Sequence, residues 1–217
     1  MTARVVIATL VLLSSSAAVS PLAAQLRLEG AALVGRTEHR VDAGFGVASS
    51  VGTSFGAMGR VQFGGPFELE ARALGGKLSA DSLARDDRSY GELRARGSVL
   101  ALPWLALQGS ATIRTYDLEP ARQRWTQLGA GAEARFDFAS GVVRSHVRAT
   151  LLPHVAVSGL PAPDFGIAGA TGIQVNYGRL LGALEYEVER YVFPTGTDGG
   201  KRREQLAGLG VRLGARW

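Results

Sequence analysis

The sequence predicts an all-β protein, a transmembrane up-and-down antiparallel β-barrel of about ten strands, with eight or twelve strands as alternatives. Three observations predict this fold. Apolar and polar side chains alternate with a period of two along most of the chain. Aromatic residues gather near both ends of the expected strands, and tight turns alternate with longer connections. The 29 glycines among 217 residues also disfavour helices, where each glycine costs about 1 kcal/mol relative to alanine.

The start of the chain predicts export from the cytoplasm. Arg4 supplies a positive charge, Val5–Leu13 is mostly apolar, and the residues that follow are mostly small or polar up to Gln25. The apolar run is shorter than the roughly 20 residues that a membrane-spanning helix needs. We therefore expect residues 1–25 to be a cleaved signal peptide and residues 26–217 to form one barrel domain. The chain has no cysteine, which excludes disulfides and thiolate chemistry.

The expected strands alternate most clearly at the C-terminus. Leu209, Val211, Leu213, Ala215 and Trp217 share one face, and glycines and arginines occupy the other. Lengths of roughly 10–14 residues suit tilted strands that cross a bilayer, which need about 9–11. The ten predicted strands are Leu26–Arg36, Ser54–Phe63, Phe67–Lys77, Tyr90–Ala101, Leu105–Tyr116, Thr126–Phe138, Val142–Leu152, Phe165–Asn176, Arg179–Val192 and Gln205–Trp217.

The connections between these strands alternate in length. Tight turns are expected at residues 64–66, 102–104, 140–141 and 177–178. Longer loops are expected at residues 37–53, 78–89, 117–125, 153–164 and 193–204. Short turns on one side and long loops on the other are typical of barrels in the outer membrane. Both termini are then expected on the periplasmic side. The alternation of Val41, Ala43 and Val47 leaves the strand number open.

The tight turns fix which residues lie opposite each other. Opposite charges across neighbouring strands contribute about 0.2–1 kcal/mol for each pair. Because charge at mid-depth in a bilayer costs about 2–4 kcal/mol, we expect the charged face to line the lumen. The predicted pairs are Arg60–Glu70, Glu92–Arg114, Glu133–Arg148 and Asp137–Arg144.

Aromatic residues favour a membrane barrel over a soluble one, because they avoid the middle of the strands. Such bands are typical of lipid-facing girdles at the two membrane interfaces. The band beside the short turns contains Phe63, Phe67, Trp104, Phe136, Phe138, Tyr177 and Trp217. The band beside the long loops contains Phe55, Tyr90, Tyr116, Trp125, Phe165, Tyr191 and Phe193.

Three glutamates, Glu185, Glu187 and Glu189, form an acidic ladder on the expected ninth strand. We expect them to pair with arginines of the last and first strands, among them Arg212, along the seam that closes the barrel. Interleaved charges of both signs favour a structural plug over an ion pathway. A narrow ion or solute channel is the alternative interpretation.

The C-terminal residues Leu209, Val211, Leu213 and Trp217 resemble the ending of small bacterial outer-membrane β-barrel proteins, the porin-like family. The resemblance implies location in the bacterial outer membrane. It also implies that the barrel-assembly machinery reads the last strand. We expect a monomer that contacts outer-membrane lipid and lipopolysaccharide.

No catalytic motif is evident, and the sequence does not favour an enzyme. The weak candidates are His154 and Asp164, with Ser158 between them. Acidic and histidine residues on the loop side of a ten-stranded barrel resemble the omptin proteases, and a His–Ser pair resembles outer-membrane lipid deacylases. Neither family can be matched residue by residue. Three scattered histidines predict no metal site, and we expect no cofactor.

Basic residues exceed acidic ones by 24 to 19, but they are spread along strands without interleaved aromatics, which argues against nucleic-acid binding. Denser charges at Lys201–Arg203, Arg122 and Arg124 fall in expected loops. They are either solvated loop charges or a site for lipopolysaccharide phosphates. The sequence thus favours a structural or surface-interaction role through long extracellular loops. A channel and an outer-membrane protease or lipid deacylase are the alternatives.

Overall fold

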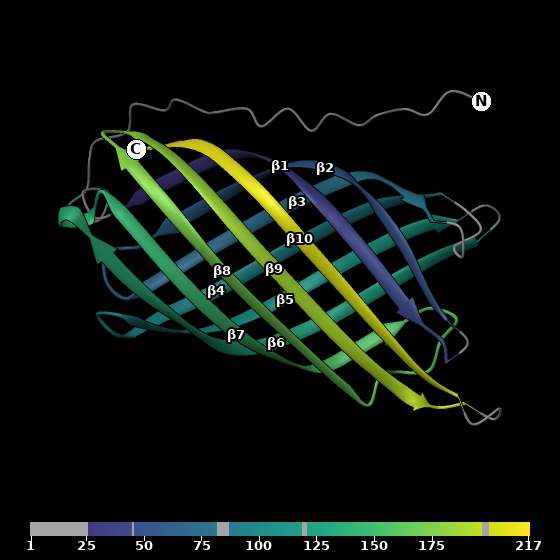
Figure 1. The fold of residues 1–217 in the computed structure, drawn as a ribbon. Helices are drawn as coiled ribbons and strands as arrows, with labels where there is room; N and C mark the ends of the chain where they lie inside the picture. Colours follow the sequence, from purple (N-terminus) through teal and green to yellow (C-terminus); the bar gives the residue numbers. More distant parts are fainter. Residues whose placement is uncertain (1–25, 45, 82–86, 119–120, 197–199) are drawn as a thin grey trace, which may run out of the picture.

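The computed structural model describes residues 26–44, 46–81, 87–118, 121–196 and 200–217. They form a closed antiparallel barrel of ten tilted strands, as predicted (Figure 1). Each strand pairs with its chain neighbours, and β1 closes the barrel against β10. The expected signal peptide lies outside the described residues. The strands are β1 (Arg27–Asp42), β2 (Val47–Gln62), β3 (Phe67–Ala80), β4 (Arg88–Leu102), β5 (Leu105–Leu118), β6 (Ala121–Phe138), β7 (Val143–Val157), β8 (Phe165–Tyr177), β9 (Leu180–Thr195) and β10 (Lys201–Arg216).

The strands are longer than predicted at the end away from the short turns, so much of the expected long loops is strand. Residues 37–42 and 47–53, for example, extend β1 and β2 as a paired hairpin. The prediction failed because outward side chains become polar there, as at Arg36, Glu38 and Arg40. Backbone pairing continues, but the apolar alternation that marks a strand stops.

The apolar face points outward and the charged face lines the lumen, as expected. Leu213 is 66% exposed, whereas the neighbouring Arg212 is 8% exposed. The same contrast recurs around the barrel, where exposed leucines and valines alternate with buried charged residues. Such a continuous apolar outer surface requires lipid around it. No helix in the described part of the chain is long and apolar enough to span a membrane.

The two aromatic bands differ, which corrects one prediction. All seven aromatics beside the short turns are exposed on the outer surface, as a lipid-facing girdle requires. At the opposite end, only Phe55 and Phe165 of the expected band are exposed. The other five point into the lumen because they share the inward alternation of the charged residues. They are Tyr90, Tyr116, Trp125, Tyr191 and Phe193.

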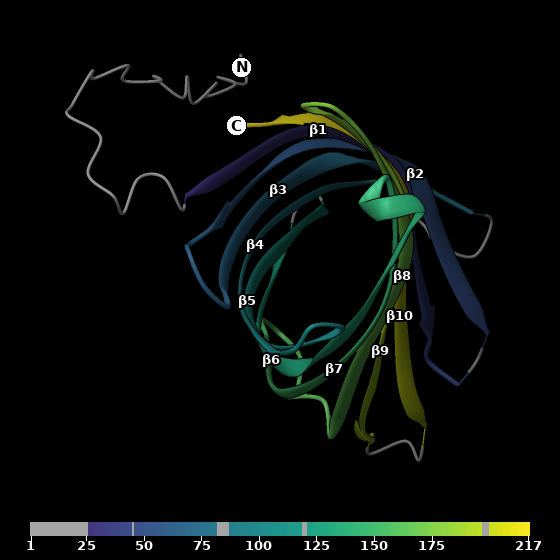
Figure 2. The same ribbon diagram turned by 90° about the vertical axis from the view of Figure 1, so that its left-hand side faces the viewer.

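The short turns lie together at the end of the barrel that faces the viewer in Figure 2. One of these connections is a 3-10 turn at Ala139–Gly141, where Ala139 and Ser140 have positive φ angles of 48° and 56°. This turn places Phe138 opposite Val143 and so fixes the register of β6 and β7. The expected registers at the turns of residues 64–66 and 102–104 also hold, which aligns the charged residues of neighbouring strands.

Candidate functional site: the charged lumen

The four predicted cross-strand pairs are all present in the register and all form ion pairs. Arg60 donates to Glu70 at 2.7 Å, and the deeply buried Arg114 donates to Glu92 at 2.7 Å. The two pairs between β6 and β7 are Arg148 with Glu133, at 3.2 Å, and Arg144 with Asp137, at 2.6 Å. These pairs form because each tight turn sets the register of its two strands.

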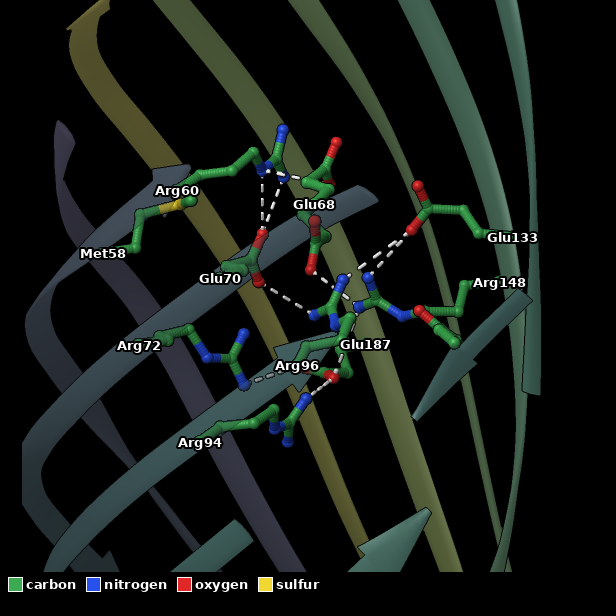
Figure 3. A network of polar contacts seen from close by, with 12 residues as sticks. Met58, Arg60, Glu68, Glu70, Arg72, Arg94, Arg96, Glu133, Arg148 and Glu187 are labelled. Carbon is green, nitrogen blue, oxygen red and sulfur yellow. Dashed lines mark hydrogen bonds and ion pairs between the residues drawn. The ribbon is translucent and has the colours of Figure 1, made fainter. Parts of the chain in front are cut away.

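The acidic ladder of β9 reaches across the lumen, which corrects the predicted seam pairing with β10 and β1. Glu187 accepts hydrogen bonds from Arg72 of β3, at 2.8 Å, and from Arg94 of β4 (Figure 3). Glu189 accepts from Arg94 at 2.7 Å and from Arg114 of β5 at 2.7 Å. The barrel wall is therefore cross-braced by ion pairs between strands far apart in the sequence.

A second group of ion pairs lies nearer the short-turn end. Arg135 donates to Glu68 at 3.1 Å and to Glu133 at 2.6 Å, linking β6 to β3 across the lumen. Arg96 lies 3.1 Å from Glu70 and 3.7 Å from Glu133 (Figure 3). Removing one partner from such a buried network typically costs about 3–5 kcal/mol, because the remaining charge is left uncompensated.

Arg212 of β10 has partners of a different kind. It donates to the Gln174 side-chain oxygen at 2.6 Å and lies 3.1 Å from the Met58 sulfur. Its Nε atom is buried and has no hydrogen-bond partner. Arg212 thus lies in the lumen as predicted, but neutral groups hold it in place of the acidic ladder.

The inward aromatics cover the charged network at the end away from the short turns. Trp125 packs against Tyr191, with ring centroids 4.9 Å apart, and against Phe193 at 6.1 Å. Tyr90 donates its hydroxyl to Glu92 at 2.8 Å, and Tyr191 donates to Glu189. The layer also includes Leu78, Leu152, Val155 and Val157. An apolar layer therefore separates these ion pairs from the outer end of the barrel, which is the end away from the short turns.

His39 of β1 bridges the lumen beside this layer, a role that the sequence reasoning missed. Its Nε2 atom lies 2.8 Å from Glu204 of β10, and Arg88 of β4 lies 3.1 Å from Nδ1. Its ring stacks on Tyr116 at 4.8 Å. Burial lowers the pKa of His39, although Glu204 opposes that shift. Thr37 and His39 are two residues apart on β1, so the alternation of inward and outward side chains could have placed His39 on the inward face.

The weak catalytic candidates lie near the outer end of the barrel. His154 is exposed on β7, and the Asp164 backbone N–H donates to the Val192 carbonyl at 2.8 Å. The Ser158 hydroxyl accepts the Arg124 backbone N–H at 2.8 Å. No contact among the described residues joins the three candidates, and their catalytic role stays a prediction. The described residues contain no cluster of three metal-ligating side chains.

The expected loop cations lie in strands, which is a further correction. Lys201 and Arg203 begin β10 and are exposed, whereas Arg202 donates to Glu204 at 2.6 Å and lies 5.7 Å above the Phe193 ring. Arg122 and Arg124 are both exposed near the start of β6. The strands extend beyond the apolar belt, so these cations lie on paired strands and not in loops.

Comparison with known proteins identifies the fold. No family model and no curated protein matches the sequence. Among solved structures, the outer-membrane protease OmpT of Escherichia coli aligns with a TM-score of 0.51 and 10% identity, over 89% of this chain and 97% of that chain. The translocator domain of autotransporter NalP from Neisseria meningitidis aligns at 0.44 with 14% identity, over 86% and 88% of the two chains. Ail of Yersinia pestis aligns at 0.37 with 13% identity, over 87% and 98%. The chain therefore has the fold of bacterial outer-membrane β-barrel proteins.

Proposed function

We propose that the protein is a monomeric outer-membrane barrel whose lumen is closed and whose outer end acts at the cell surface. The observation that carries the proposal is that two successive layers of side chains fill the lumen. Ion pairs fill the part towards the short turns, and the aromatic layer of Trp125 and its neighbours covers them. A general diffusion pore requires an open aqueous lumen, which these layers oppose.

A closed lumen moves the expected function to the surface beyond the apolar belt. Three adjacent strands, β9, β10 and β1, carry outward cations there. Gln205 of β10 lies opposite Arg190 of β9 and Arg40 of β1 in the register. Arg203 precedes Gln205 by two residues and therefore lies on the same outward face of β10. Exposed arginines beyond the apolar belt suit the phosphates of lipopolysaccharide, because guanidinium groups bind phosphate with paired hydrogen bonds.

The likeness to OmpT does not extend to a proposed protease activity, because at 10% identity it concerns the fold alone. The surface proposal is tested with the variant Arg40→Gln/Arg190→Gln/Arg203→Gln. We expect lipopolysaccharide to raise the unfolding temperature of the wild type in detergent, and to raise that of the variant less. Arg27→Gln/Lys77→Gln/Arg179→Gln is the matched control, since it removes three exposed cations that lie on β1 near the short turns, on β3, and between β8 and β9.

An equal response of the wild type and the triple variant would contradict the phosphate site. With dephosphorylated lipopolysaccharide, the unfolding temperatures of the wild type and the triple variant should respond equally. The closed lumen has its own test, since the wild type should give no steady current in a planar lipid bilayer. A persistent open channel would contradict that part of the proposal.

A further inference from the structure

The two walls of the lumen differ in what they present. Strands β3 to β7 and β9 contribute arginines, glutamates and aromatics that meet across the barrel. The wall of β10, β1 and β2 instead presents small residues at many inward positions, including Gly208, Gly210 and Gly35. Beside it lies a cavity of about 80 Å³ whose lining includes Leu33, Gly35, Thr37, Ser54, Gly208 and Gly210. The lining also includes three glutamates, each of which is ion-paired with an arginine: Glu70, Glu185 and Glu187. The closure is therefore thinnest along this wall.

A second cavity opens at the short-turn end of the barrel. This vestibule of about 150 Å³ is rich in positive charge, because the arginines that line it outnumber the acids. Its lining includes Gln174, the residue that accepts the hydrogen bond from Arg212. Arg212 itself lines the cavity of the small-residue wall. Its side chain thus lies between the two cavities.

Arg212 is held less firmly than the arginines of the opposite wall. Arg94 bonds to both Glu187 and Glu189, and hydrogen bonds between charged groups are about twice as strong as those between neutral ones. Arg212 is held by an amide oxygen and a thioether sulfur, and its Nε atom is left without a partner. Displacing Arg212 therefore breaks fewer strong interactions than displacing Arg94.

His39 closes the same wall at its outer end. Thr37, which lines the small-residue cavity, bonds to Ser54 at 3.0 Å, and His39 follows on the same face of β1. The His39 ring reaches Glu204 and stacks on Tyr116. A route along this wall would therefore meet two side chains in series, Arg212 and His39.

We propose that the small-residue wall of β10, β1 and β2 is a narrow path for small inorganic anions, closed by Arg212 and His39. The surplus of arginines in the vestibule favours anions over cations along this path. This inference goes beyond the closed-barrel function, because it locates where the closure can be opened. The resting protein remains closed.

The test is the current carried by purified barrels in planar bilayers bathed in potassium chloride. We expect Arg212→Ala/His39→Ala to carry a mean current about tenfold or more above the wild type, because both side chains that close the path are removed together with the hydrogen bonds that hold them. Under a salt gradient, the reversal potential should show chloride preference. Each single variant should conduct less than the double variant.

A filling substitution in the same background makes the test specific. A Cβ atom at Gly210 would lie 3.6 Å from the Val34 carbonyl, which is an ordinary contact, so Gly210→Leu can project into the cavity. Added to the double variant, it should abolish the current. Gly109→Leu is the matched control, because Gly109 is exposed on β5 and has no atom closer than 3.9 Å to an added Cβ.

Folding of each variant is checked by its resistance to detergent denaturation before recording. A folded double variant that stays silent would overturn the path, as would a current that Gly210→Leu leaves unchanged. Cation preference would overturn the assigned selectivity. A wild type that conducts steadily would instead contradict the closed-barrel proposal, so the two failures are distinguishable.

Discussion

The two ends of the barrel use the same alternation for different purposes. At the short-turn end, Trp104 and Trp217 face outward into the girdle. At the hairpin end, Trp125 and Tyr191 face inward and cover the ion pairs. The difference shows that an aromatic near a strand end is assigned to lipid or lumen by its place in the alternation. Its position along the strand does not decide this.

The comparison also separates strong from weak ion pairs, and it predicts the largest effect for Arg114→Ala. Arg114 is 1% exposed and bonds to Glu92 and Glu189. Its loss would remove one of the two or more cations that neutralise each of these buried carboxylates, and breaking such a buried network costs about 3–5 kcal/mol. Urea unfolding in lipid vesicles measures the change, and a loss below about 1 kcal/mol, the value typical of an exposed pair, would contradict it.

An effect of similar size is expected for Trp125→Ala. The indole of Trp125 is 1% exposed, and its removal leaves a cavity in the aromatic layer that costs about 3–5 kcal/mol. Trp104→Ala, at the lipid-facing girdle, is the matched change and should cost clearly less, because Trp104 is 49% exposed. Equal costs for the two variants would remove the distinction between the ends.

Acid should weaken the hairpin end selectively through His39. His39 lies beyond Arg36, above the apolar belt, and burial holds its pKa below the ordinary range of a histidine. The unfolded chain therefore takes up this proton more readily. The stabilisation is complete above about pH 6.5 and is lost as the pH falls towards the lowered pKa, by at most about 1.4 kcal/mol per pH unit.

Comparing unfolding free energies at neutral and mildly acidic pH tests this effect. His39→Gln keeps a polar side chain but cannot titrate, so its pH dependence should be flatter than that of the wild type. Parallel curves for the two proteins would show that His39 is not the titrating group. Hydrogen exchange of β1 amides near His39 locates the change.

The smallest effect is expected at the short-turn end. Arg144→Ala removes the ion pair with Asp137, in which both side chains are more than one third exposed. Such pairs contribute about 0–1 kcal/mol, and salt screens them. Urea unfolding should detect little change, and less still at high salt. A loss as large as that of Arg114→Ala would mean that exposure does not rank these pairs.

The sequence predicted local features better than those that depend on barrel closure. The Arg60–Glu70 pair follows from a tight turn, so alternation and turn length suffice to predict it. The Arg72–Glu187 pair joins β3 to β9 across the lumen and depends on the tilt and stagger of the closed barrel, which alternation does not encode. The outer extensions were missed because polar residues occupy both faces there.

The inward aromatics show a different kind of error. Tyr90 and Glu92 share one face of β4, as Tyr191 and Glu189 share one face of β9, so the alternation already placed them in the lumen. Their position near strand ends suggested a lipid girdle instead. Where the position of an aromatic near a strand end and its place in the alternation disagree, the alternation determines whether it faces lipid or lumen. A one-residue change of register that turned the aromatic outward would also expose the charged residues of the same face.

Lipid-dependent fluorescence quenching tests the orientation of the two faces most directly. Single-tryptophan proteins that retain Trp217 or Trp125, with the other tryptophans replaced by phenylalanine, are folded into vesicles that contain brominated lipid. We expect strong quenching of Trp217 and little quenching of Trp125, whose indole lies inside the barrel. Strong quenching of Trp125 together with weak quenching of Trp217 would contradict it.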